Sequence, residues 1–213
     1  MTAIDVKLLP GYFEKYCWEK HHGVYGYPSD TFPSFRWIKS LEERGAWLAS
    51  ATEMKTAPTN LIRELLDWGG GAGPRVKFEV GLGNVSLLAQ TQLVVGNINN
   101  PKIAIEKALL IPGCGLTYAS KFLRFLRPEI HASLDNRIRR ALVKNGLLGL
   151  ITDGNDPSMI RGYVAFLELL SKLMMELEQA HINRPDCDLP RGISPSGWRV
   201  ADIEMALFAW ADQ

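Results

Sequence analysis

Apolar residues along most of the chain recur three or four positions apart, which is the spacing of one face of an α-helix. The longest such stretch is predicted to begin at Pro157 and to run to about His181. Its apolar stripe consists of Ile160, Val164, Leu167, Leu170, Met174 and Leu177. Further helices are expected over residues 10–20, 34–50, 59–68 and 198–211, and also from residues 84, 100 and 135 onwards. Because only residues 75–83 suit a short extended piece, the sequence predicts an almost entirely α-helical fold.

Turn-forming residues separate these predicted helices. Thr59 is expected to cap a helix that ends at Trp68. The glycines that follow, as far as Pro74, are expected to form a mobile loop or a connection between two lobes. They do not form a phosphate loop of the Gly-Lys-Ser/Thr type, because no such residues follow them. Adjacent His21 and His22 cannot share a helix face as metal ligands would, and we expect both in a surface loop.

The composition is that of one globular domain or of two closely packed lobes. The chain has 213 residues, of which 46% are apolar and 22% are charged. With 24 basic and 23 acidic residues, it carries no overall field that would draw it to nucleic acid or to a membrane. The charge is nevertheless uneven between residues 119 and 144. That segment contains seven basic residues and only two acidic ones. The basic residues are Lys121, Arg124, Arg127, Arg137, Arg139, Arg140 and Lys144, and the acidic residues are Glu129 and Asp135. Such a run suits a solvated face or a nucleic-acid footprint.

The cysteines and the beginning of the chain argue against several classes of protein. Cys17, Cys114 and Cys187 are scattered and odd in number, so neither a disulfide framework nor a structural zinc site is expected. The first residues lack the apolar core of a signal peptide, and the sequence contains no apolar run of 18 residues. We therefore expect a cytoplasmic protein without a bound metal.

The stretch from residue 108 to residue 142 carries the clearest chemical signal. A helix-like segment ends at Pro112, a hairpin with Gly113 and Gly115 follows, and a second helix begins at once. Free backbone amides at the start of such a helix can hold a phosphate. Eighteen residues after Thr117, Asp135 precedes a third helix that carries arginines. Taken singly, the glycines can simply end a helix and Asp135 can simply cap one.

This arrangement resembles the helix-hairpin-helix DNA glycosylases, the superfamily of endonuclease III and the 8-oxoguanine glycosylases. The resemblance implies a single domain over 1–213 with two helical lobes and a cleft between them. The hairpin and the Asp would occupy residues 100–145, and the last helix, 198–212, would return to the N-terminal lobe. It also implies binding to duplex DNA with one base swung out of the stack. Members with an iron–sulfur cluster carry four cysteines near the C-terminus, and since only Cys187 lies there we expect no cofactor.

The resemblance also assigns roles to the residues of the hairpin segment. Asp135 matches the carboxylate that stabilises an oxocarbenium-like sugar and activates water. Thr117 stands where members that also cut the strand have a Schiff-base Lys, which implies base release without strand cleavage or a degenerate, non-catalytic protein. The residues expected to contact nucleic acid are Gly113, Gly115, Thr117, Lys121 and Arg137.

Residues of the expected base pocket come from two helices. Glu204 and Phe208 match positions of the last helix of 8-oxoguanine glycosylases where a Gln reads the guanine edge and a Phe covers the ring. They lie four residues apart and so share a helix face, although a surface Glu and a core Phe would give the same pattern. Lys121 and Phe125 match pocket positions after the hairpin, where Lys121 replaces a small thiol.

Two functions follow from these expectations. The first is a monofunctional glycosylase that excises an oxidised or otherwise modified guanine-like base. The second is a non-repair or catalytically degenerate relative in bacterial antiphage defence, where operons that make cyclic-oligonucleotide signals include glycosylase-like accessory proteins. Such a protein would recognise a guanine or deazaguanine base or a conjugate of one. The fold alone does not separate the two.

Overall fold

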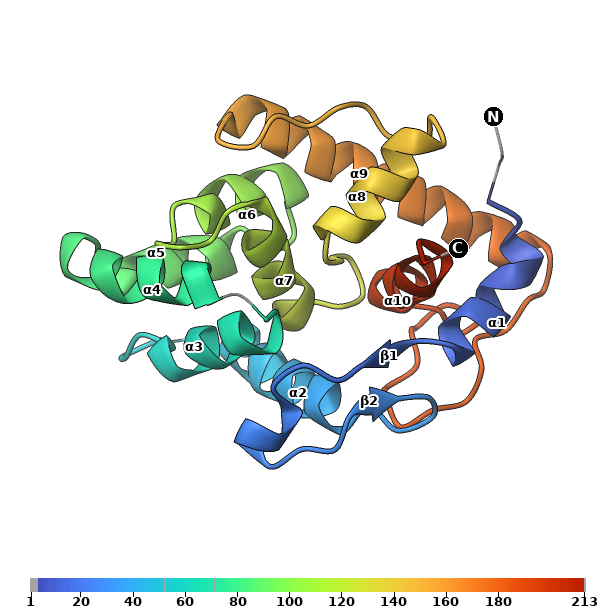
Figure 1. Cartoon of the computed structure of the whole chain (residues 1–213), viewed down its shortest axis with the longest axis horizontal. Coiled ribbons are helices and arrows are strands. Elements are labelled where there is room, and N and C mark those ends of the chain that lie inside the picture. The colour runs from blue at the N-terminus through green and yellow to red at the C-terminus, as the bar shows by residue number, and fades with distance from the viewer. Residues whose placement is uncertain (1–3, 52, 71, 213) are drawn as a thin grey trace.

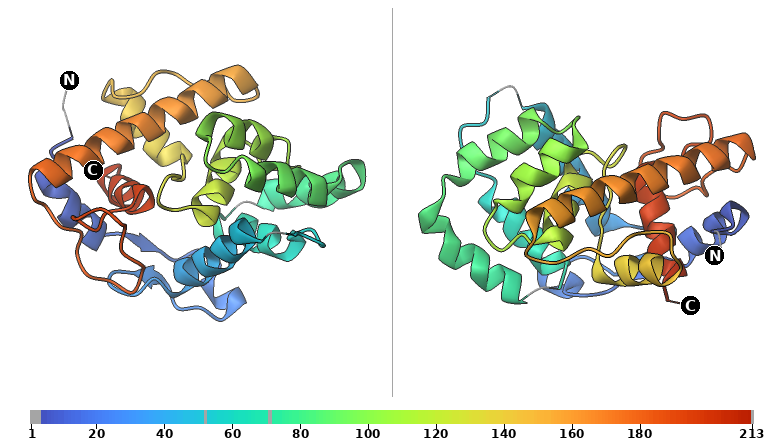
Figure 2. Two further views of the ribbon diagram at one scale, coloured as in Figure 1. Left: turned by 180° about the vertical axis from the view of Figure 1, so that it is seen from behind. Right: turned by 90° about the horizontal axis from the view of Figure 1, so that it is seen from above.

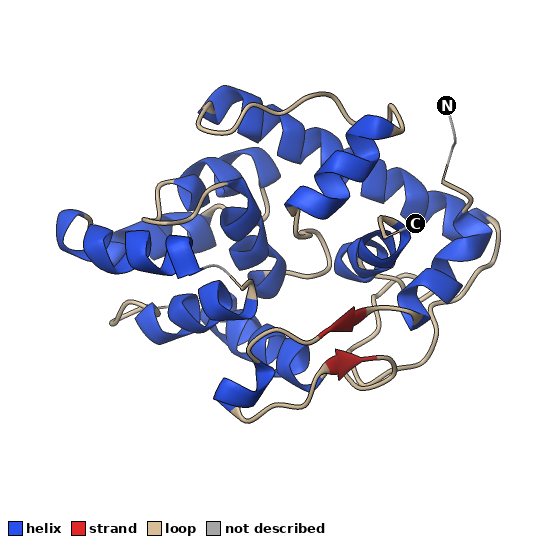
Figure 3. Cartoon of the chain, viewed as in Figure 1, coloured by secondary structure: helices blue, strands red, loops and turns tan. Residues whose placement is uncertain are grey.

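The computed structural model describes residues 4–51, 53–70 and 72–212. Over these residues the fold is all-α, with ten α-helices and a single pair of two-residue strands, β1 and β2 (Figure 3). The first five helices are α1 (Leu9–Glu14), α2 (Arg36–Ser50), α3 (Thr59–Trp68), α4 (Ala72–Gly81) and α5 (Leu87–Gly96). The remaining five are α6 (Pro101–Leu109), α7 (Leu116–Leu126), α8 (Asn136–Lys144), α9 (Asp156–Gln179) and α10 (Val200–Trp210).

The two strands and two of the 3-10 turns lie within the first 31 residues, and the third 3-10 turn follows α4. Strand β1 (Cys17–Trp18) pairs antiparallel with β2 (Asp30–Thr31), so that Trp18 stands opposite Asp30. The 3-10 turns are η1 (Val6–Leu8), η2 (His22–Tyr25) and η3 (Leu82–Asn84). The expected helix over 10–20 is therefore shorter than predicted, since α1 ends at Glu14.

The helices form two groups that α9 joins (Figure 1). In one group α7 packs against α2, α3 and α6, while α4 lies against α3 and α5 against α6. In the other group α1 packs along α10, and α8 also contacts α10. The long helix α9 packs on α6 at one end and reaches η1 and α10 at the other, as seen from behind in Figure 2. The C-terminal helix thus lies beside α1 near the N-terminus.

Local capping explains why several helices begin where the sequence predicts. The side chain of Asn100 accepts a hydrogen bond from the Ile103 amide at 3.3 Å, and Pro101 occupies the first turn. Asp135 caps α8 through the amide of Ile138 at 2.9 Å. The predicted cap at Thr59 is wrong by one residue, because Pro58 precedes the first turn of α3 and no side chain caps it.

Two other predictions for the first half of the chain are wrong. Residues 75–83 form most of α4 and of η3 instead of an extended piece. The helix is possible because Pro74 lies in its first turn, where a missing amide costs little, and because it buries Phe78. The glycine-rich connection is consequently short; Gly71, within it, lies outside the described residues.

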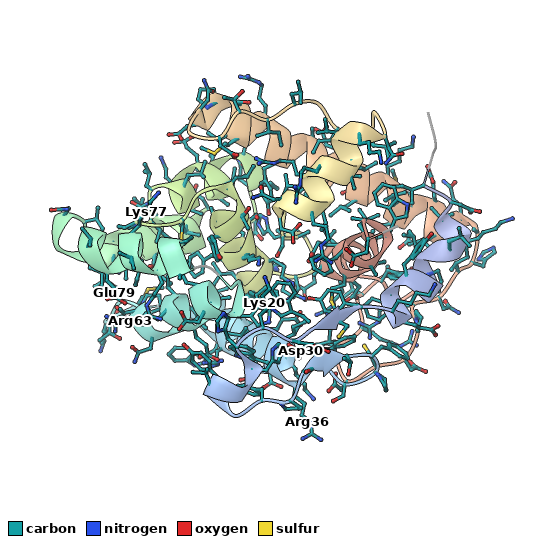
Figure 4. All side chains as sticks on the ribbon, viewed as in Figure 1. Lys20, Asp30, Arg36, Arg63, Lys77 and Glu79 are labelled. Atoms are coloured by element: carbon teal, nitrogen blue, oxygen red, sulfur yellow. The ribbon has the colours of Figure 1, made fainter. Side chains whose placement is uncertain are left out.

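His22 is the second correction, since it is buried and not part of a surface loop. Its Nε2 lies 2.8 Å from Oδ2 of Asp30, which is labelled in Figure 4. The other carboxylate oxygen of Asp30 accepts from the amide of Trp37 at 3.0 Å. Burial raises the pKa of Asp30, and the contact with His22 opposes that rise. His22 and Asp30 therefore anchor the first loop to the start of α2, whereas neighbouring His21 is exposed.

A buried chain of ion pairs connects the two helix groups. Glu42 of α2 lies 2.9 Å from Nη1 of Arg124 on α7 and 2.7 Å from Nη1 of Arg199, which precedes α10. Arg199 in turn contacts Asp202 at 2.7 Å, and Asp202 contacts Arg184 at 3.0 Å. Removing one member of such a buried set leaves an uncompensated charge, so the set fixes α10 relative to α2 and α7.

Candidate functional site

The turn between α6 and α7 is a tight hairpin that requires only one of its two glycines. Gly113 has a φ of +75°, and a Cβ there would lie 2.3 Å from the carbonyl oxygen of Pro74. Gly115 has a φ of −69° and caps α7 without a side chain, and an added Cβ would meet no atom within 4 Å. The space in front of Gly115 is thus open at the point where the free amides of α7 begin. A phosphate can approach the helix there.

Cys114, between the two glycines, belongs to the core. It is 5% exposed, and burial raises the pKa of its thiol to about 12. A thiol with so high a pKa is inert as a nucleophile, so the contribution of Cys114 is packing.

Asp135 does more than cap α8. It is half-buried, and it lines a small cavity where α3, α7, α10 and strand β1 converge. The cavity is lined by Tyr16, Trp18, Trp68, Lys121, Ser133, Asp135, Glu204 and Phe208. Its volume of about 10 Å³ gives room for roughly one water molecule. The expected carboxylates and the expected aromatic ring therefore lie together, in a space that must widen before a base can enter.

Aromatic side chains are four of the eight residues that line the cavity. Trp18 lies in the middle, with its ring 5.7 Å from that of Trp68 and 5.6 Å from that of Phe208. Tyr16 packs on Phe208 at 5.5 Å between ring centroids. Flat apolar walls of this kind suit a planar heterocycle, which gains about 1–3 kcal/mol per stacked base.

The buried amine of Lys121 lies among the aromatic rings of the cavity. Its Nζ lies 4.7 Å from the ring centroid of Trp68, 5.4 Å from that of Trp18 and 5.5 Å from that of Tyr118. Burial lowers the pKa of Lys121, while the carboxyl groups of Asp135 and Glu204 oppose that effect. At 4% exposure the side chain faces the cavity and cannot grip the outer nucleic-acid backbone.

Glu204 is a buried carboxyl group on α10 with an altered protonation equilibrium. Burial raises its pKa to about 8, and the neighbouring Asp135 adds to the rise. The guanidinium of Arg124, whose Nε lies 3.8 Å away, opposes it, as do Lys121 and the backbone amide of Ser133. At neutral pH the group is mainly protonated, so it can both donate and accept a hydrogen bond at the cavity wall.

Two fully buried polar atoms of the cavity residues have no hydrogen-bond partner among the described residues. They are the indole Nε1 of Trp68 and the hydroxyl Oγ of Ser133, in side chains that are 4% and 2% exposed. A buried polar group without a partner costs about 1–3 kcal/mol. Such groups beside a cavity are therefore candidates for contact with a ligand.

The other predicted site residues lie around the cavity without lining it. Phe125 is buried behind Trp68, at a ring distance of 5.1 Å. Thr117 is half-buried in the first turn of α7, one turn before Lys121. Arg137 stacks its guanidinium 4.1 Å from the ring centroid of Phe208 and also pairs with Asp212.

The basic residues between 119 and 144 do not form one exposed face. Lys121 and Arg124 are buried, Arg137 pairs with Asp212, and Arg139 pairs with Asp153 at 2.6 Å. An exposed lysine outside that run lies at the site instead: Lys20 (labelled in Figure 4) has its Nζ 5.5 Å from the ring centroid of Trp18. It also lies against Gly70, just after α3.

Sequence reasoning did not single out Tyr16, Trp18, Lys20, Trp68 or Ser133. The available signals were weak: two aromatics at alternate positions after the first helix, and a Trp immediately before three glycines. These segments are far apart along the chain, and only the fold brings them to one place.

Comparison of the chain with models of protein families, with curated proteins and with solved structures finds no match. Within the described residues, His, Cys, Asp and Glu side chains form no group of three that could hold a metal ion. In the same part of the chain, no helix combines the length and the apolar character needed to cross a membrane.

Proposed function

We propose that this protein binds nucleic acid through the hairpin before α7 and hydrolyses the N-glycosidic bond of a guanine-like base. The observation that carries the proposal is the position of Asp135, which caps α8 and also lines an aromatic cavity together with Glu204 and Phe208. The sequence resemblance to helix-hairpin-helix glycosylases supports the same function.

Asp135 would act on the sugar. Cleavage of the glycosidic bond builds positive charge on the deoxyribose, and a fixed carboxylate at the cavity stabilises that charge and orients the attacking water. The cap contact with Ile138 at 2.9 Å holds one oxygen of Asp135, which leaves the other for the sugar or the water. The hairpin amides and Lys20 would hold phosphates on either side of the extruded nucleotide.

A second candidate function is recognition of a guanine or deazaguanine base without cleavage, as in an antiphage signalling protein. The observation that favours it is Lys121, whose amine lies in the same cavity as Asp135. A cation at that position opposes the positive charge that glycosidic cleavage would develop on the sugar.

The test is chromatography of the free bases released from duplex oligonucleotides that carry guanine, 8-oxoguanine, alkylated purines or deazaguanines. The wild type should release one class of guanine-like base and leave the strand intact. Asp135→Asn should keep the fold, because Asn also caps helices, and should release none. Equal release by wild type and variant would remove Asp135 from the mechanism. Tight binding of one base without release by the wild type would support the second candidate.

A further inference from the structure

We propose that Trp68 is a specificity-determining residue whose indole N–H donates to the acceptor edge, N7 or O6, of the bound guanine-like base. This inference rests on the proposed function. It adds which edge of the bound base contacts each side of the cavity.

The indole N–H of Trp68 is a donor that the protein leaves unused. Nε1 is buried without a hydrogen-bond partner, although the side chain lines the cavity. Trp18 shows the contrast, because its own Nε1–H donates to the carbonyl oxygen of Trp68 at 2.8 Å. Indole nitrogen only donates, so a group that satisfies Trp68 must be an acceptor.

The position of Trp68 is fixed by its neighbours. The hydrogen bond from Trp18 holds its carbonyl, and the hydroxyl of Tyr118 donates to the carbonyl of Gly69 at 3.2 Å. A Cβ on Gly69 would lie 2.4 Å from the ring of Tyr118, so a glycine is needed where α3 ends against α7. The Trp-Gly pair of the glycine-rich stretch thereby places an indole at the cavity wall with little freedom to turn away.

The polar groups of the cavity fall into two sets. Trp68 and Lys121, with Nζ 4.7 Å from the indole ring, supply donors. Glu204 and Asp135, on and before helices of the other group, supply carboxyl oxygens. Trp18 lies between the two sets, since its ring packs on Trp68 and on Phe208.

Guanine has a matching division of its edges. O6 and N7 are acceptors only, whereas N1 and the exocyclic amine carry donors. Two N–H donors from the base favour the ionised form of Glu204. With that carboxylate on the N1 and amine edge, the O6 and N7 edge turns toward Trp68 and Lys121. Since the closed cavity holds roughly one water, its lining side chains must move apart before the base can enter.

A cycle of matched changes in the protein and the base tests the inference. The probes are duplexes with guanine, 7-deazaguanine (no N7 acceptor) or 6-thioguanine (a weaker acceptor at position 6), each opposite an abasic site to ease extrusion. Dissociation constants are measured by fluorescence anisotropy at one salt concentration, with the Asp135→Asn protein to prevent turnover. That background is expected to bind guanine about 2- to 10-fold more tightly than one of the two analogues, as one hydrogen bond predicts.

Trp68→Phe in the same background should remove that preference and bind the guanine and analogue duplexes equally. The matched control is Trp37→Phe, a buried indole outside the cavity whose N–H donates to Glu64 at 2.7 Å. It should keep the preference among the three duplexes. If Trp68→Phe does not fold, 3-benzothienylalanine at position 68 keeps the bicyclic shape without the N–H and should give the same loss.

The outcomes separate the two proposals. A preference that persists in a folded position-68 variant, or that is absent from the start although the duplexes bind, overturns the role of Trp68 alone. Failure of wild type and Asp135→Asn to bind any of the duplexes at low salt overturns the proposed function and this inference with it.

Discussion

Replacement of Glu204 by Gln should change how the stability of the protein depends on pH. The carboxyl group is 6% exposed, and its pKa in the folded protein is raised from an ordinary 4.5 to about 8, mainly by burial. Gln keeps the shape and the hydrogen-bonding groups of a protonated Glu but cannot ionise. The variant therefore isolates the free-energy cost of placing a negative charge on α10 beside Asp135.

The sign and the size follow from the two pKa values. The folded protein binds this proton more tightly than the unfolded chain does, so the contribution to stability is complete below about pH 4.5. It is lost as the pH rises toward about 8, and above that value it changes no further. At about 1.36 kcal/mol for each pH unit in that interval, the loss is roughly 4 to 5 kcal/mol.

The assay is urea unfolding of wild type and Glu204→Gln at pH 5, 6.5 and 8, followed by circular dichroism. The free energy of unfolding of the variant should rise relative to the wild type by roughly 3 to 4 kcal/mol between pH 5 and pH 8. Other titrating groups are common to both proteins and largely cancel. Glu14→Gln, at an exposed position, controls for the loss of one acidic side chain.

A difference between the two proteins that does not change with pH would refute this reasoning. A variant that loses stability relative to the wild type as the pH rises would also refute it. The pH-independent difference would mean that Arg124, with Nε 3.8 Å from the carboxyl group, holds Glu204 ionised in the folded protein throughout the range from pH 5 to pH 8.

Two further predictions concern the hairpin. Gly113→Ala should destabilise the protein by about 2 kcal/mol or more, because it forces a side chain into the left-handed region and against Pro74. Gly115→Ala should cost less than about 1 kcal/mol of stability and should mainly weaken DNA binding. Thermal melts and anisotropy titrations that rank the two variants alike would contradict this. Thr117→Lys should form a borohydride-trapped adduct with DNA carrying an abasic site, and the wild type should form none, since a hydroxyl cannot form an imine. An adduct with the wild type would instead show that another amine at the site, Lys121 or Lys20, is the nucleophile.

The sequence by itself determined the helical class and most helix starts, because these depend on residues close together in the chain. The side chains of Asn100 and Asp135 each fix the start of a helix through a hydrogen bond within its first turn. Pro101 also suits the first turn that follows Asn100. Asp135, Glu204 and Phe208 could also be selected as candidates that share a site, and the structure places all three at one cavity. Their chemical roles remain predictions for the release and binding experiments.

Only the tertiary structure decided which side chains are removed from water. Lys121 and Arg124 belong to a basic run in the sequence, yet both are buried, because α7 is covered by α2, α3 and α6. His22 was expected in a surface loop, but pairing with Asp30 across the β1–β2 turn buries it. Whether a side chain is buried depends on segments that are distant along the chain and pack over it, so a local sequence pattern cannot predict its burial. For the same reason, the sequence does not show that the indole N–H of Trp68 lacks a partner. That feature is visible only in the structure, where hydrogen bonds from Trp18 and Tyr118 hold the backbone of Trp68 and Gly69 in place.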